Sequence, residues 1–288
     1  MPLTPTADIL APAAATGTGV GAFNVAQIEH AEAIIAGAER AGTPVILQIS
    51  QNAAHYHGAL EPIAAATLAA ARAAEAPVAV HLDHATDPAL VYQAVDLGFG
   101  SVMFDASTLD YDDNVAATGE ITRACHQHGV FVEAELGEVG GKDGVHAPGA
   151  RTDPHQAAAF VAATRVDALA VAVGTSHAML TRDATVDTDL IGRLRAVVPV
   201  PLVLHGSSGL PDQQLTAAVT AGITKVNIAT QLNKVFTVAT RRYLAAHPVA
   251  VDPRHYLAAG RAAAAAESAR LLLLVRCAQP ARRHPEHI

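Results

Sequence analysis

The sequence predicts an α/β protein built as a single (β/α)8 barrel with a C-terminal helical extension. Short apolar, β-branched segments alternate along the chain with alanine-rich segments of helical character. A barrel of this kind needs about 250 residues, and the chain has 288. Polar residues closely follow the apolar segments, which is typical of an active site at one end of a parallel sheet.

Eight apolar segments have the length and composition of buried strands. Their near-continuous apolar character favours a parallel sheet that is covered on its outside. We expect strands at residues 20–25, 44–49, 78–82, 101–104, 130–136, 168–173, 201–205 and 224–229.

The segments between these strands carry signals for the start and end of helices. The Asp-Pro pair at 87–88 opens a helix that stops at Gly98, and the Pro-Asp pair at 211–212 opens one that stops at Gly222. Strict alternation of strands and helices leaves two folds, an open doubly wound sheet and a closed barrel.

The polar residues decide between these two folds. A barrel gathers the carboxyl ends of all its strands into one rim, whereas an open sheet would scatter them along a crevice. We therefore choose the barrel. The residues at or just past a strand end are Asn24, Ser50, Asp83, Asp105, Glu135, His177, His205 and Asn227.

The sequence shows no internal repeat and no second domain. We expect one domain over residues 1–288, with the barrel core at about 20–240 and a C-terminal helix at about 253–276. The tail at 278–288 is expected to be disordered.

Composition excludes several classes of partner. The chain carries 27 acidic and 19 basic residues, for a net charge of −8, which argues against nucleic acid. Its longest apolar run near the C-terminus, at 271–275, is far shorter than the roughly 20 residues of a membrane span. The first residues lack a basic start and include Asp8, so we expect no secretory signal. The two cysteines, Cys125 and Cys277, suit a reducing compartment. We expect a cytoplasmic protein with no membrane partner.

Histidines at strand ends predict a metal site. The sequence HLDH at 81–84 ends one strand, and His177 and His205 each follow another. One such histidine is more often a hydrogen-bonded core or rim residue. Three neutral imidazoles that converge on one rim, with a ligand position left open, are typical of catalytic zinc.

Two further segments indicate substrate binding. The sequence HGSSG at 205–209 precedes a helix, and its small residues let backbone N–H groups approach a phosphate. The loops after strands seven and eight, here 205–209 and 225–230, commonly bind phosphate in such barrels. The glycine-rich connection at 137–153 is long enough to act as a lid.

The motifs, taken in order, resemble those of class II fructose- and tagatose-bisphosphate aldolases. The resemblance extends from about Val20 to Leu274, and its motifs are HLDH, SVMFDAS, EAELGEVGG, AVAVGTSH, PLVLHGSSG, KVNIAT and DPRHYL. Several ordered motifs at the predicted strand ends make the likeness far more specific than any one of them.

The resemblance implies roles for the acidic and histidine side chains. Asp83 would be the acid that serves the aldehyde oxygen, and Asp105 and Glu135 match positions that can hold a second metal ion in relatives. The ligands of the catalytic zinc (Zn2+) would be His84, His177 and His205.

The resemblance also implies a phosphorylated sugar as substrate. Arg254 matches an arginine that, in relatives, reaches the distal phosphate from the neighbouring subunit, so we expect a homodimer or homotetramer. The positions that match substrate-binding segments are Asn24, Ser50, Ala178, Gly206, Ser207, Ser208, Asn227, Ile228, Ala229, Thr230 and Arg254.

The sequence departs from the family at three places. Ala178 stands where relatives usually have glycine, and Ala229 replaces an acidic or amide residue, as in the tagatose-bisphosphate branch. The lid lacks the glutamate that serves relatives as the base. We therefore expect Asp143 to abstract the substrate proton, with Glu138 as the second candidate.

The expected activity is zinc-dependent, reversible cleavage of fructose or tagatose 1,6-bisphosphate to dihydroxyacetone phosphate and glyceraldehyde 3-phosphate. The two sugars differ only at C4, and the sequence does not choose between them. One alternative is a non-catalytic barrel subunit that stabilises an active partner. Another is an aldolase that forms an imine through Lys225, which lies two residues before Asn227.

Overall fold

The computed structural model describes residues 3–137, 151–176, 179 and 181–276. It confirms the predicted fold, because eight strands form a closed barrel in sequence order and every neighbouring pair is parallel. The strands are β1 (Val20–Asn24), β2 (Val45–Ser50), β3 (Val78–Ala85), β4 (Ser101–Phe104), β5 (Phe131–Leu136), β6 (Ala168–Val171), β7 (Leu202–Leu204) and β8 (Ile223–Ile228).

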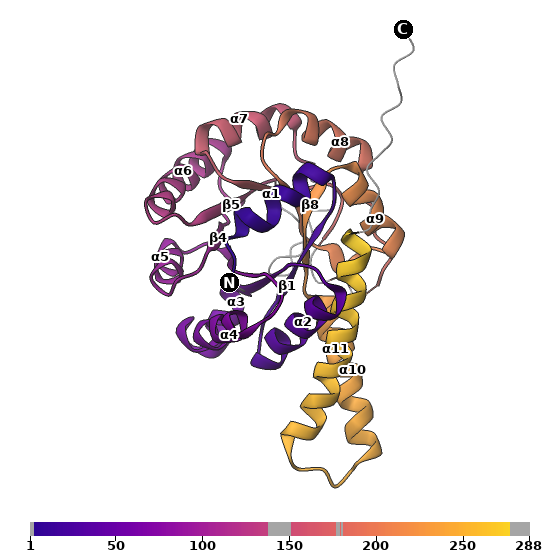
Figure 1. The fold of residues 1–288 in the computed structure, drawn as a ribbon. Helices are drawn as coiled ribbons and strands as arrows, with labels where there is room; N and C mark the ends of the chain where they lie inside the picture. The colour runs from indigo at the N-terminus through magenta and orange to yellow at the C-terminus, as the bar shows by residue number, and fades with distance from the viewer. Residues whose placement is uncertain (1–2, 138–150, 177–178, 180, 277–288) are drawn as a thin grey trace.

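Helices cover the outside of the barrel (Figure 1). The two helices whose ends we predicted, near 88–98 and 211–222, are both present as α5 and α9. The helical elements are α1 (Thr6–Thr16), α2 (Ile28–Ala41), α3 (Gln51–His57), α4 (Glu61–Ala73), α5 (Pro88–Asp96), α6 (Tyr111–Gln127), α7 (Pro154–Thr164), α8 (Thr188–Val197), η1 (Ser207–Gly209), α9 (Asp212–Ala221), α10 (Thr230–Ala246) and α11 (Pro253–Arg276).

The strand bounds differ from the predicted ones mainly at the carboxyl ends. Strand β3 continues to Ala85 instead of stopping at residue 82, and its register with β4 shifts between Leu82 and Ala85. Strand β6 ends at Val171 and β7 at Leu204, so His205 lies just outside the sheet. The apolar segments of the sequence thus predict where each strand lies. The last residue of each strand depends on its pairing with the neighbouring strands.

Apolar side chains form two kinds of core. The larger one lies between the outward faces of the strands and the surrounding helices. A smaller one fills the inside of the barrel at its N-terminal end and consists of Ile9, Leu10, Ala13, Val20, Ala22, Ile46 and Ala79. The small residues of this inner core leave room for the side chains that α1 contributes.

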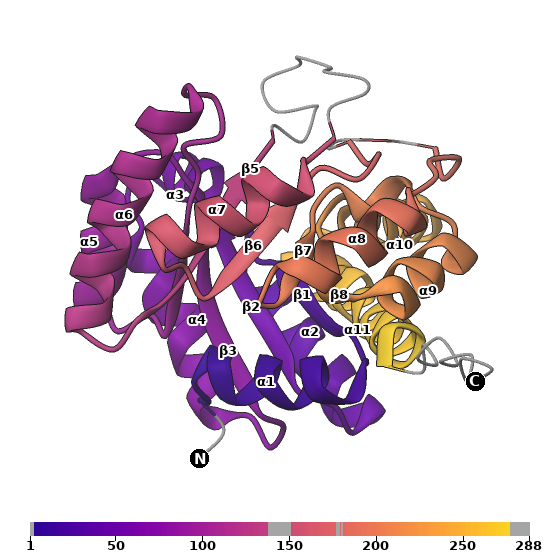
Figure 2. The same cartoon turned by 90° about the horizontal axis from the view of Figure 1, so that it is seen from above.

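Helix α1 is an element that the sequence did not lead us to expect. It lies across the end of the barrel where the strands begin (Figure 2), and it packs against β1, β3 and β8. Its residues Ile9 and Leu10 are buried. Closing this end of the barrel leaves the opposite rim as the place for an open site.

Helices α10 and α11 form an antiparallel pair that projects from the barrel (Figure 1). The half of α11 nearest the barrel packs closely on α2, where a Cβ at Gly37 would come within 2.7 Å of Ser268 Cβ. The predicted C-terminal helix is therefore present and anchored by small residues. The predicted tail at 278–288 lies outside the described residues.

No helix in the described part of the chain is long and apolar enough to cross a membrane.

Candidate active site

The predicted site residues gather at the rim where the strands end. Asn24 ends β1, Asp83 and His84 lie near the carboxyl end of β3, and Asp105 directly follows β4. Glu135 lies in β5, His205 directly follows β7, and Asn227 lies in β8. His177, Ala178 and Asp143 lie outside the described residues.

Three of these residues form a group that could hold a metal ion. His84, Glu135 and His205 each offer one ligand atom, and these atoms all lie within 4.8 Å of one another. The His84 Nε2 and His205 Nδ1 atoms are 2.8 Å apart, and a Glu135 carboxylate oxygen lies 3.7 Å from His205 Nδ1. Imidazole and carboxylate are ligands that zinc accepts.

The hydrogen bonds behind the two imidazoles test whether a cation fits between them. Asp105 Oδ2 lies 2.8 Å from His84 Nδ1, and Glu133 Oε1 lies 2.9 Å from His205 Nε2. Carboxylates only accept hydrogen bonds, so the nitrogen that faces each carboxylate carries the proton. The remaining nitrogens, His84 Nε2 and His205 Nδ1, then point lone pairs at each other. Such a pair fits a metal cation held between them.

An unusual backbone conformation directs His84 toward this group. Its φ is 48°, in the left-handed region that residues other than glycine seldom adopt. The residue lies within the register shift between β3 and β4, and irregularities of this kind re-aim side chains beside active sites. As a result, Asp83 and His84 both face the rim although they are consecutive in a strand.

Asp83 has partners of its own, apart from the metal-ligand group. Its carboxylate accepts hydrogen bonds from Asn24 Nδ2 at 2.8 Å and from Asn227 Nδ2 at 3.2 Å. Burial tends to raise the pKa of this carboxyl group, but the adjacent imidazoles of His84 and His205, the ammonium group of Lys225 and the hydrogen bond from Asn24 hold the pKa below its ordinary value. The side chain is thus an oriented hydrogen-bond acceptor next to the metal-ligand group.

The two segments expected to bind phosphate contact each other in the structure. Gly206 has φ 66°, and a Cβ there would lie 2.7 Å from the backbone of Ser176, so only glycine fits. Ser207 Oγ donates to the Asn227 carbonyl, and Ser208 Oγ accepts from the Gln231 backbone N–H at 3.2 Å.

The start of α10 lies beside these serines. Ile228 is buried at the end of β8, Ala229 precedes α10, and Thr230 begins this 17-residue helix. The first N–H groups of a helix favour an anion such as phosphate. This placement agrees with the expectation for Ile228, Ala229 and Thr230 and leaves their contact with substrate as a prediction.

Two residues that were expected to bind substrate, Ser50 and Arg254, make other contacts in this chain. Ser50 Oγ accepts from the Ala53 N–H at 3.2 Å and so caps α3. Arg254 is in the first turn of α11, at the end of the α10–α11 pair away from the barrel (Figure 1), and its ion pair with Asp252 leaves its side chain 86% exposed. Arg254 therefore does not face the site of its own chain.

Sequence reasoning missed two polar residues below the rim and gave a third another role. Gln48 Nε2 donates to Asn24 Oδ1 at 2.7 Å. Glu133 contacts both His205 and Lys225. For Lys225 the sequence suggests only the role of an imine-forming nucleophile. The signal for Glu133 was present, because alternation along a strand places it on the same face as Glu135.

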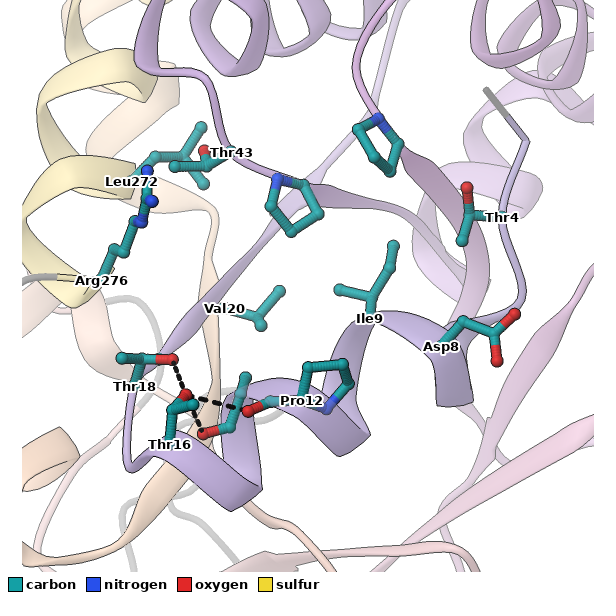
Figure 3. A pocket seen from close by; sticks show the side chains of 14 residues that line it. Thr4, Asp8, Ile9, Pro12, Thr16, Thr18, Val20, Thr43, Leu272 and Arg276 are labelled. Carbon is teal, nitrogen blue, oxygen red and sulfur yellow. Dashed lines mark hydrogen bonds between the residues drawn. The ribbon is translucent and has the colours of Figure 1, made fainter. Parts of the chain in front are cut away.

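A hollow of about 350 Å3 lies at the other end of the molecule, beside α1 (Figure 3). Its walls are mostly apolar and include Ile9, Pro12, Val20 and Leu272, with Asp8 and Arg276 at its edge. It holds no cluster of histidines and acids among its lining residues, so we place the chemistry at the opposite rim.

Comparison with known proteins gives the same family over nearly the whole chain. The family model described as fructose-bisphosphate aldolase class-II matches residues 4–279. The crystal structure of the YdjI aldolase from Escherichia coli K12 is 30% identical, covers 95% of this chain and 97% of its own, and superposes with a TM-score of 0.83. Fructose-bisphosphate aldolase from Campylobacter jejuni, at 21% identity, covers 94% of this chain and 93% of its own with a TM-score of 0.80, which shows the shared fold.

Proposed function

Because the chain belongs to the class II fructose-bisphosphate aldolase family, we propose that it cleaves a ketose 1,6-bisphosphate reversibly in a zinc-dependent reaction. As a member of this family the protein is an aldehyde-lyase. The proposed substrates are fructose 1,6-bisphosphate and tagatose 1,6-bisphosphate, and the products are dihydroxyacetone phosphate and glyceraldehyde 3-phosphate.

The observation that carries the proposal is the pair of imidazole nitrogens that face each other across 2.8 Å beside Glu135. We propose His84, His205 and His177 as the zinc ligands. Glu135, with Asp105, remains the proposed position of a second metal ion. When bound, zinc supplies a Lewis acid that polarises a carbonyl group.

Asp83 is the proposed group for proton transfer at the C4 oxygen. In cleavage it takes the proton of the C4 hydroxyl as the C3–C4 bond breaks, and in synthesis it returns that proton to the aldehyde oxygen. Asn24 and Asn227 each donate to one of its two oxygens, which holds the carboxylate in one orientation. This fixed orientation supports a role in proton transfer, for which geometry comes first.

The phosphate of the dihydroxyacetone portion is proposed to bind between Gly206–Ser208 and the start of α10. The left-handed turn at Gly206 and the short contact between Ser207 and Asn227 hold these two segments together. Backbone N–H groups there would fix the substrate while its bonds rearrange.

The imine alternative through Lys225 conflicts with both the family and the contacts of this lysine. Imine-forming aldolases do not use the metal site that class II members share, and Lys225 Nζ is fully buried and donates to Glu133 Oε2 at 2.7 Å. Borohydride added with substrate should therefore leave the enzyme active. Irreversible inactivation that depends on Lys225 would restore the imine mechanism.

The experiment that tests the proposed function is a cleavage assay of the purified protein on both sugars. We expect activity on at least one sugar, loss of this activity after dialysis against a chelator, and recovery on addition of zinc. Activity that persists in chelator would overturn the metal mechanism. If the protein cleaves neither sugar, the result would instead favour a non-catalytic subunit.

A further inference from the structure

A buried ion pair lies directly beneath the proposed zinc site. Glu133, which points into the barrel from β5, contacts His205 with one carboxylate oxygen and Lys225 with the other, at 2.9 Å and 2.7 Å. All three side chains are at most 1% exposed. In the reaction proposed above neither Glu133 nor Lys225 contacts the substrate or the metal.

The contact with Glu133 decides which nitrogen of His205 carries the proton. A carboxylate can only accept, so the 2.9 Å contact with Glu133 places the proton on Nε2 and the lone pair on Nδ1. Asn227 Nδ2 lies farther from Nε2, at 3.2 Å, and donates to Asp83. That lone pair points at His84 Nε2, 2.8 Å away. With the proton on Nδ1 instead, an N–H group would occupy the space where a metal ion needs a ligand atom.

Lys225 fixes the orientation of the Glu133 carboxylate, so that one oxygen faces the ammonium group and the other faces His205. Its ammonium group holds Oε2, and His81 Nε2 lies 3.8 Å from this same oxygen. Oε1 is then the oxygen left for His205. Because the group is enclosed, solvent does not compete for these bonds, and a low local dielectric strengthens them.

We propose that Glu133, held in place by Lys225, is a positioning residue that sets the tautomer of His205 and thereby prepares this imidazole to bind zinc. The proposal rests on the proposed function in one respect, namely that His205 is a zinc ligand. Asp105 stands in the same relation to His84, at 2.8 Å from its Nδ1, so each imidazole has its own carboxylate. Carboxylates behind metal-binding histidines typically change metal affinity by about 10- to 100-fold when they are removed.

The first test reads the tautomer of His205 without any metal. The metal-free protein, labelled with 15N in its histidines, is compared by NMR with Glu133→Gln, and the His205 signals are assigned from their loss in His205→Asn. We expect the wild type to show one tautomer with the proton on Nε2. Glu133→Gln should populate the other tautomer, because the amide can turn its NH2 group toward Nε2.

The second test measures zinc affinity by competition with a chromophoric chelator. Glu133→Gln should bind zinc about 10- to 100-fold more weakly, while Glu120→Gln, the same change at an exposed position on α6, should bind like the wild type. An unchanged tautomer and an unchanged zinc affinity in Glu133→Gln would overturn the proposal.

A double variant separates positioning from a merely structural role. Lys225→Met leaves the Glu133 charge buried without its cation and should lower the melting temperature. Glu133→Gln combined with Lys225→Met removes both charges and should regain part of that loss, yet its zinc affinity should stay low. Recovery of zinc affinity together with the melting temperature would show that the pair only stabilises the barrel.

These outcomes are distinguishable from failure of the proposed function. A wild-type protein that binds no zinc would contradict the proposed metal chemistry. In that case the tautomer of His205 in the metal-free protein still tests the role of Glu133 on its own.

Discussion

Two consecutive residues at the end of β3 make separate sets of contacts. His84 lies against Asp105 and His205, whereas Asp83 accepts from Asn24 and Asn227. The positive φ of His84 allows this division, because it turns two neighbours of a strand toward the same rim. Substitutions at single residues should therefore separate metal binding from proton transfer.

Replacement of His205 by alanine should remove both bound zinc and aldolase activity. The imidazole contributes Nδ1 to the metal-ligand group, so its removal takes away one of the ligand atoms that hold the ion. Metal analysis of the purified variant, together with a cleavage assay, measures both losses. Full activity of His205→Ala after dialysis against a chelator would contradict a catalytic zinc.

Replacement of Asp83 by asparagine should leave zinc in place and lower turnover. Asp83 is not among the three residues of the metal-ligand group, and a general acid or base contributes about 10²- to 10⁴-fold to a rate. Turnover and zinc content are measured on the same preparation. Should zinc be lost together with activity, Asp83 would instead act by orienting His84.

The group that abstracts the substrate proton is predicted to lie on the glycine-rich connection at 137–153. Asp143 is the predicted base, with Glu138 as the second candidate, and both lie outside the described residues. Asp143→Ala should abolish exchange of the C3 proton of dihydroxyacetone phosphate with deuterated water while binding of this compound persists. NMR follows the exchange in the absence of aldehyde. Exchange at the wild-type rate would assign the step to Glu138 or to another group.

At the level of secondary structure, close helix packing depends on glycine. A Cβ on Gly37 of α2 would lie 2.7 Å from Ser268 Cβ and 2.9 Å from the Ala265 carbonyl oxygen of α11. By contrast, a Cβ on Gly192 of α8 would meet no atom within 4 Å. Both glycines lie within helices, where alanine is the better helix former. They differ in how closely other atoms approach them.

Alanine at these two positions should therefore have opposite effects on stability. Gly37→Ala should lower the free energy of unfolding by about 1–3 kcal/mol, the usual cost of overpacking. Gly192→Ala should raise it by about 0.5–1 kcal/mol, because alanine is the better helix former. Urea unfolding of both variants beside the wild type measures the difference. A stabilised Gly37→Ala would mean that α11 can move away from α2 at little cost.

At the level of the whole molecule, the projecting α10–α11 pair bears on assembly. Its far end carries Val249 and Val251, which are 88% and 90% exposed, and Arg254, which faces solvent in this single chain. The family resemblance places Arg254 in the site of a neighbouring subunit. A homodimer or homotetramer therefore remains our proposal for the active form.

Mixed oligomers can test a shared site. Arg254→Ala and Asp83→Asn should each have low activity alone. Unfolding and refolding them together should restore part of the activity, because some mixed sites combine an intact Asp83 with an intact Arg254 of the partner. Size-exclusion chromatography with light scattering gives the oligomeric state in parallel. Two variants that form mixed oligomers without any gain in activity would show that Arg254 does not act across subunits.

Sequence alone was sufficient for the barrel and for much of its rim. A parallel strand covered on both faces is mostly apolar, so each strand is visible in the sequence as a short apolar segment. Polar residues at the ends of these apolar segments, such as Asp83 and His205, indicate the rim of the barrel in the same way. Periodicity carried less information for α1, a short alanine-rich helix with Pro12 in its interior.

Only the tertiary structure decided how the rim residues meet. The tautomers of His84 and His205 depend on Asp105 and Glu133, which lie 21 and 72 residues away from them in the chain. The turn of His84 arises from the register between β3 and β4, and the pairing of Lys225 with Glu133 spans 92 residues. Local sequence determines which segments become strands, because burial and propensity act over a few residues. Contacts across the barrel form only when the barrel closes. Its closure determines that Nε2 of His84 and Nδ1 of His205 face each other.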